Sequence, residues 1–319
     1  MTMPEAVMKV LIAYDGSTCA DAAVEELKYA GFPGHTEALV VTVAHEGFPR
    51  KDSVVPRAPE DSAWQAGIKE AAALSNDARL RIQRDFPDWK VSSEPLWGDT
   101  QKTLLKTIEH WKPDVVVVGS HGRNAAGRLV LGSVSLELVR HAPCTVRVSR
   151  AHTDYASTSP RILVATDGSA HAEAAIQEIA ARKWSSEIEV KVICVLQTLV
   201  PAVAGMGSLE SSTFATEPAF QIIEHSDKEE RERLQTVART SVATLMKNAG
   251  ITASASLIEG NPADAIVKEA ETWNAGTVFV GARGLGLLDR IFLGSVSNAA
   301  VNHCHCTVEV VRPQAISKS

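Results

Sequence analysis

Short apolar runs alternate along the chain with longer segments in which apolar residues recur every three or four positions. The first run, at 9–13, precedes a segment at 20–27 with the spacing of one helix face. Further apolar runs lie at 39–44, 114–118, 145–148, 277–280 and 307–310, and helical spacing returns at 71–82, 104–111, 234–245 and 266–273. Apolar strands separated by amphipathic helices are typical of a parallel sheet covered on both faces.

The chain contains an internal repeat of this pattern. The segment VLIAYDGS at 10–17 returns as ILVATDGS at 162–169, and the segment at 119–135 returns at 281–297. The offset grows from 152 residues (10 to 162) to 162 residues (119 to 281), so the second copy carries an insertion, which we place within 198–225. This insertion is either a mobile lid over the second half or an ordinary long loop.

The repeat defines the expected fold and domains. We predict an α/β fold of two tandem doubly wound units, each a mainly parallel five-stranded sheet with helices on both faces. The first domain spans 1–150, a polar linker that ends in proline spans 151–160, and the second domain spans 161–313.

Three features of each copy fall at the carboxyl ends of strands, where doubly wound sheets bind ligands. An aspartate follows the first strand, two glycines follow the fourth, and a Gly-Ser pair opens the next helix. They are Asp15, Gly119, Gly122, Gly132 and Ser133 in the first copy, and Asp167, Gly281, Gly284, Gly294 and Ser295 in the second. The aspartate suits a ribose hydroxyl or a metal, and the glycines and the helix start suit a phosphate.

The spacing differs from two common phosphate-binding motifs. A Walker-type loop needs a lysine that neither copy has, and a dinucleotide fingerprint follows the first strand rather than the fourth. The shared spacing is G-x2-G-x9-G-S. Its occurrence in two copies, each with an upstream Asp-Gly-Ser, favours a ligand site over simple turns.

This combination resembles the ATP-binding type of the universal stress protein family over nearly the whole chain. The resemblance implies ATP, with or without Mg²⁺, in each half. It places Asp15 at the ribose and phosphate end and the main chain of Val43 against adenine. The residues implied around the phosphates are Gly119, Gly122, Gly132, Ser133 and Ser135. Their counterparts in the second half are Asp167, Val195, Gly281, Gly284, Gly294, Ser295 and Ser297.

The first copy departs from the family pattern between its glycines, where it reads Arg123-Asn-Ala-Ala and the second copy reads Leu285-Gly-Leu-Leu. Two interpretations stay open: this departure weakens the first site, or Arg123 strengthens its hold on phosphate.

The resemblance implies a regulatory or stress-response protein in which nucleotide binding controls domain packing or partner interaction. Neither copy shows a base that positions water against a phosphate, so we assign no catalytic residue. Slow ATP hydrolysis is one alternative, and a nucleotide-free interaction module with vestigial pockets is another. The sequence does not distinguish ATP from ADP or AMP.

Composition and charge argue against some classes of partner. A net charge of −6 without a Lys/Arg cluster argues against nucleic acid, and the apolar runs are too short to cross a bilayer. With no leader-like segment and with scattered cysteines, we expect a cytoplasmic protein with reduced thiols. The cluster His303-Cys-His-Cys306 suggests a metal, but His303 and Cys306 match His141 and Cys144 of the first copy, which favours a strand entry.

Arg147 and Glu309 hold equivalent positions in the closing strands of the two halves. In the resembled family these strands pair across a two-fold axis, which implies an intramolecular pseudo-dimer here. Opposite charges favour pairing of unlike halves. A homodimer of whole chains is a further arrangement.

Overall fold

The computed structural model describes residues 7–45, 60–122, 131–150, 160–184, 187–197, 217–248, 250–284 and 293–313. The strands of the first half are β1 (Met8–Ala13), β2 (Thr36–Ala44), β3 (Lys90–Trp97), β4 (Val115–Gly119) and β5 (Thr145–Ser149). Those of the second half are β6 (Arg161–Ala165), β7 (Ile188–Leu196), β8 (Ile251–Glu259), β9 (Thr277–Gly281) and β10 (Thr307–Val311).

Helices connect these strands in each half. The first half has α1 (Thr18–Glu25), the short η1 (Glu26–Tyr29), α2 (Glu60–Asp85), α3 (Thr100–Trp111) and α4 (Ser133–His141). The second has α5 (Ala170–Ala181), α7 (Glu217–Leu245), α8 (Pro262–Thr272) and α9 (Ser295–His303). Most of the expected insertion, 198–216, and Arg123 lie outside the described residues, and 217–225 belongs to the start of α7.

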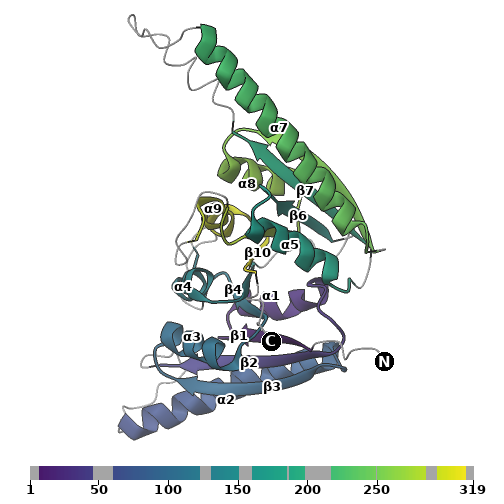
Figure 1. Ribbon diagram of the computed structural model, residues 1–319. Coiled ribbons are helices and arrows are strands. Elements are labelled where there is room, and N and C mark those ends of the chain that lie inside the picture. The colour runs from purple at the N-terminus through teal and green to yellow at the C-terminus, as the bar shows by residue number, and fades with distance from the viewer. Residues whose placement is uncertain are drawn as a thin grey trace, which may run out of the picture.

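The two predicted five-stranded sheets form one ten-stranded sheet, in the order β3-β2-β1-β4-β5-β10-β9-β6-β7-β8. Pairing within each half is parallel, as in β1 with β4 and β6 with β9. The halves join where β5 and β10 pair antiparallel, with Arg147 opposite Glu309. The doubly wound α/β fold is therefore confirmed, and Figure 1 shows the two halves stacked around this junction.

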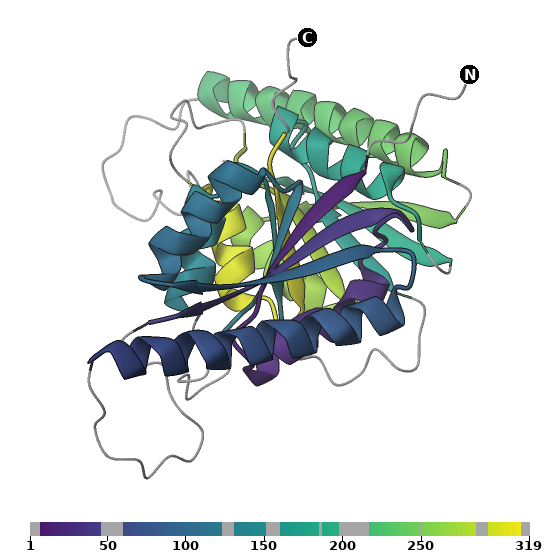
Figure 2. The same cartoon turned by 90° about the horizontal axis from the view of Figure 1, so that it is seen from below.

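Both faces of the sheet are covered by helices (Figures 1 and 2). One apolar core runs under α3, α4, α8 and α9 and continues across both halves. On the other face, α1 and α2 cover the first half, and α5 and α7 cover the second. Successive residues of β4 alternate between the two cores, as strand geometry requires: Val116 and Val118 face one, and Val115 and Val117 face the other.

The edge strands β3 and β8 were not evident in the apolar pattern. In β3 exposed positions alternate with partly buried ones, so its sequence KVSSEPLW carries no continuous apolar run. An edge strand with one solvated face has this composition. In the described part of the chain, no helix combines the length and apolarity needed to cross a membrane.

Two arginines link the halves by hydrogen bonds in a nearly symmetric way. Arg150, which follows β5, donates hydrogen bonds to the carbonyls of Val301 and Cys304 at the end of α9. Arg312, which follows β10, donates to the carbonyls of Val139 and Arg140 at the end of α4. Each half thus satisfies the unpaired carbonyls at a helix end of the other half.

A buried cluster of charged side chains also lies at the junction of the halves. Glu309 accepts hydrogen bonds from both Arg147 and Arg182, and none of the three side chains is more than 2% exposed. Burial raises the pKa of Glu309, but the two guanidinium charges outweigh it and hold this pKa below its ordinary value. Glu26, from the first half, accepts a hydrogen bond from Thr307 of β10. Charge pairing therefore spans the junction of the halves.

Candidate functional site

Among the described residues, a cavity lies at the carboxyl ends of the strands in each half. The first has a volume of about 610 Å³ and the second about 1130 Å³. The first is lined by Asp15, Val43, Gly119, Gly122, Gly132, Ser133 and Ser135, and the second by Asp167, Val195, Gly281, Gly284, Gly294, Ser295 and Ser297. These fourteen residues, all expected from the sequence, therefore line one cavity or the other, and Arg123 lies outside the described residues.

The Asp-Gly-Ser segment places Asp15 at the first cavity. The main-chain N–H of Ser17 donates to Asp15 Oδ1 at 2.9 Å, and Gly16 takes a left-handed conformation (φ 71°) that suits glycine. The Ser17 hydroxyl accepts from the N–H of Ala20 and so caps α1. This turn fixes the Asp15 carboxylate at the cavity.

The second half repeats this turn closely. Ser169 N–H donates to Asp167 Oδ1 at 2.9 Å, and Gly168 has φ 80°. The Ser169 hydroxyl caps α5 and donates to the carbonyl of Arg283, as the Ser17 hydroxyl donates to the carbonyl of His121. The capping serine therefore ties the aspartate turn to the glycine loop in both halves.

The two glycines after the fourth strand serve different needs. A Cβ on Gly119 would lie 2.7 Å from the Cys19 backbone, and one on Gly281 would lie 2.6 Å from the His171 backbone. The first glycine thus lets a helix pack against the end of the strand. A Cβ on the second glycine would instead meet an aspartate oxygen, at 3.0 Å for Gly122 and Asp15 and at 2.6 Å for Gly284.

The Gly-Ser pair opens a helix toward each cavity. Gly132 and Gly294 are extended N-caps without a capping side chain, and Ser133 and Ser295 are exposed. The N–H groups of such a first turn have no partner inside the helix and carry the positive end of its dipole. This arrangement can bind an anion.

Ser135 and Ser297 lie two residues further, within the same first turn, and position the loop. Their buried hydroxyls donate to the carbonyls of Gly119, at 2.7 Å, and of Gly281, at 2.6 Å. Each hydroxyl therefore donates its hydrogen to the carbonyl at the end of the strand, and the serine holds the glycine turn beside the helix start.

Several groups that line the second cavity were not evident from the sequence. Arg233 of α7 donates to the main-chain oxygen of Asp167 at 2.9 Å and pairs with Glu230 at 2.7 Å. Glu230 and Arg233 belong to the charged run at 227–233, and Arg233 directly precedes the apolar helix face that begins at Leu234. Arg140 and His141 also line this cavity, although they come from the first half.

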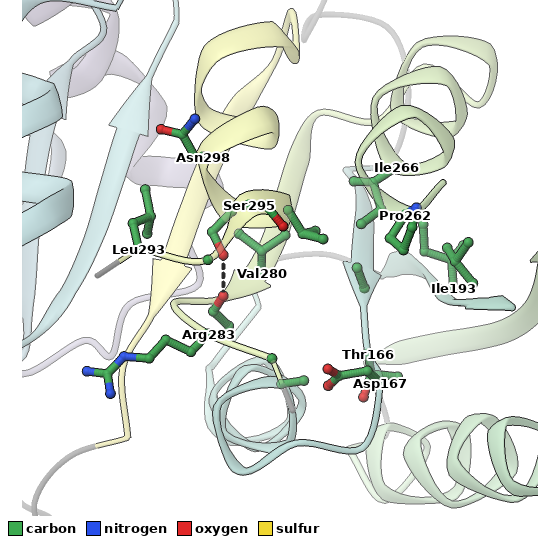
Figure 3. Close-up of a pocket in the computed structure, with 18 of the residues that line it drawn as sticks. Thr166, Asp167, Ile193, Pro262, Ile266, Val280, Arg283, Leu293, Ser295 and Asn298 are labelled. Carbon is green, nitrogen blue, oxygen red and sulfur yellow. Dashed lines mark hydrogen bonds between the residues drawn. The ribbon is translucent and has the colours of Figure 1, made fainter. Parts of the chain in front are cut away.

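Figure 3 shows how the second cavity is arranged. Asp167 and Thr166 lie at one end, Ile193, Pro262 and Ile266 along one side, and Ser295 near the middle. Leu293 and Asn298 lie at the end opposite Asp167. The cavity thus joins an apolar wall, an anion-binding helix start and a carboxylate, the mixture typical of small-molecule sites.

Cys304 and Cys306 are buried at the start of β10. Among the described residues, no group of three histidine, cysteine or acidic side chains is placed to hold a metal ion. The Cys306 hydrogen bond lowers the pKa of Cys304, although burial opposes it. The pair contributes to the junction and lies outside both cavities.

The fold and its paired cavities define a tandem α/β protein with one strand-edge pocket in each half. Comparison with sequence models of known families matches residues 7–150 and 159–312 to the universal stress protein family. The chain therefore belongs to the universal stress protein family, in a tandem form.

Individual relatives agree with this assignment. The chain is 28% identical over 321 residues to a universal stress protein of Mycobacterium tuberculosis, covering 98% of this chain and 99% of that protein. Among solved structures, it is similar to a universal stress protein from Archaeoglobus fulgidus (TM-score 0.59, 19% identity, 95% and 98% of the two chains). A protein of unknown function from Pseudomonas aeruginosa gives a TM-score of 0.63 at 15% identity, covering 97% of this chain and 93% of that one. These two structures support the fold.

Proposed function

We propose that this protein is a regulatory or stress-response protein of the cytoplasm that binds an adenine nucleotide, with ATP as the main candidate, in one or both cavities. Binding alters domain packing or the affinity for a partner, with little or no turnover. The apolar wall takes the base beside Val43 or Val195. The first turn of α4 or α9 takes the phosphates, together with the glycine pair before it. Asp15 or Asp167 takes a ribose hydroxyl or a phosphate-bound Mg²⁺.

One observation carries this proposal: each cavity is lined by an uncapped helix start and by the equivalent aspartate. Gly132 and Gly294 have nearly identical extended conformations (φ −64° and −62°), and both helices lack a capping side chain. An aspartate oxygen lies beside the second glycine of each loop. Retention of an uncapped helix start in both copies is expected of an anion site, because a capping side chain would otherwise stabilise the helix.

The first test is thermal unfolding with and without ATP and Mg²⁺. A ligand that binds only the folded form stabilises it by about 2.7 kcal/mol at about 100 times its Kd. Ser133→Asp and Ser295→Asp each place a carboxylate at an exposed first-turn position, where it repels phosphate but suits the helix dipole. We expect each variant to lose nucleotide binding at one site while its nucleotide-free stability is not reduced.

The outcomes separate three functions. An ATP-dependent shift that Ser295→Asp or Ser133→Asp reduces supports regulated binding. Phosphate release that the same substitutions abolish would instead indicate a slow ATPase. If ATP produces no shift and no nucleotide is retained on purification, the pockets are vestigial and the protein is an interaction module.

The junction suggests how binding could act on packing. We propose that the halves form an intramolecular pseudo-dimer through β5 and β10, with α4 and α9 each linking one cavity to the opposite half through Arg312 and Arg150. Homodimerisation of whole chains is a further proposal, which sedimentation with and without ATP tests directly.

A further inference from the structure

The two cavities differ in where their walls come from. Every described residue that lines the first cavity belongs to the first half. The second cavity is nearly twice as large and is also lined by Arg140 and His141, which end α4 of the first half. The second site is therefore a composite of both halves.

A single helix position accounts for part of this difference. Leu136 of α4 and Asn298 of α9 are equivalent by the repeat, 162 residues apart. Leu136 packs against the apolar core of its face, whereas Asn298 lines the second cavity. Figure 3 shows Asn298 at the end opposite Asp167. The cavity continues past the start of α9 on this side.

Arg140 lines the second cavity from the other half. Arg140 is exposed, and within the residues that the structure describes its guanidinium makes no hydrogen bond or ion pair. The equivalent residue of the second half, Asn302, is neutral and donates to the carbonyl of Asn298 in its own helix at 2.7 Å. His141 follows Arg140 in the chain, and its Nε2 lies 3.6 Å from Glu137 Oε1. The positive charge of Arg140 is thus available at the second cavity, which is also lined by Asp167, Glu230, Arg233 and Arg283.

We propose that the second site prefers a nucleoside polyphosphate whose distal phosphates reach from the start of α9 to Arg140 of the other half. Arg140 is then a specificity-determining residue that contacts the ligand, because a guanidinium binds phosphate through paired, charge-assisted hydrogen bonds. A nucleoside monophosphate ends at α9 and does not reach it. This inference rests on the proposed nucleotide function and names the ligand class of the second site.

The test measures the Kd values of AMP, ADP and ATP by calorimetry in a Ser133→Asp background, where only the second site is available. Arg140→Gln is expected to raise the Kd of ATP about tenfold, which corresponds to the loss of a charge-assisted contact of about 1.4 kcal/mol. The Kd of AMP should change by less than about twofold. Arg140→Lys retains part of the ATP preference. The matched control is Asn302→Ala, at the equivalent helix position, which leaves all three Kd values unchanged.

Two results overturn the inference. One is an unchanged ATP affinity in Arg140→Gln, and the other is an equal loss for AMP and ATP, which would show that Arg140 does not act on the distal phosphates. Failure of the proposed function looks different, because the protein with Arg140 intact would then bind none of the three nucleotides. Thermal unfolding without nucleotide checks that each variant is folded, as expected for substitutions of an exposed residue.

Discussion

Glu26 is an acidic residue held at the junction of the halves with 4% of its surface exposed. Burial raises its pKa from 4.5 to about 6, and the charge of Arg147, 3.8 Å away, lowers it only in part. The folded protein therefore binds this proton more tightly than the unfolded chain does. By linkage, the contribution of Glu26 to stability is greatest below about pH 4.5 and is lost as the pH rises through about 6.

Glu26→Gln removes this dependence. We expect the variant to be more stable than the parent by about 1 to 2 kcal/mol above pH 6.5 and to lose that advantage toward pH 4.5, since one pKa unit corresponds to about 1.4 kcal/mol. Urea unfolding at pH 4.5, 5.5 and 7.5 measures the difference. The parent protein, unfolded at the same three pH values, is the control. A constant difference at all three pH values would contradict the assignment.

At the scale of elements, the glycines separate into those required by the fold and those facing the ligand site. A methyl group on Gly281 would press on the backbone of α5 at 2.6 Å, whereas one on Gly294 would have no neighbour closer than 3.4 Å. Backbone atoms cannot move aside as a side chain does. Gly281→Ala is therefore expected to destabilise the fold by about 3 kcal/mol, the upper part of the overpacking range, and Gly294→Ala by less than about 0.5 kcal/mol.

Chemical unfolding of the two variants measures this contrast, and Gly119→Ala should behave like Gly281→Ala because its Cβ would meet the Cys19 backbone at 2.7 Å. Equal stability of Gly281→Ala and Gly294→Ala would show that α5 can shift away from β9. The separation of the helix from the strand would then not be fixed by packing.

These glycines show which features of the site the sequence could predict and which it could not. Spacing and repetition located the aspartates, the glycines and the Gly-Ser pairs that line the cavities, because the strand ends of a parallel sheet meet at one edge. The spacing could not show that Gly119 and Gly281 are needed against a helix, since that contact depends on how α1 and α5 pack. It also could not show that Arg140 reaches the second cavity, because only the pairing of β5 with β10 brings α4 to it.

At the scale of the whole molecule, Glu309 is the shared partner of two buried arginines. It accepts from Arg182 Nη1 at 2.8 Å and also from Arg147, across the strand pair that joins the halves. Removing its charge leaves both guanidinium groups buried with less compensation. Removing Arg147 instead leaves Glu309 still bonded to Arg182 through both of its oxygens. The two partners of the cross-strand pair are thus unequal.

Glu309→Gln is expected to destabilise the protein by about 3 kcal/mol, as when a buried ion pair loses one partner, and Arg147→Met by less than half of that. Exchanging the charges with Arg147→Glu and Glu309→Arg together should not restore stability, because the new arginine at 309 would face Arg182. Urea unfolding followed by tryptophan fluorescence measures all three variants. Recovery of the parent stability in the exchanged protein would show that the cross-strand pair acts alone, so the joining of the halves would not depend on the α5 end at Arg182.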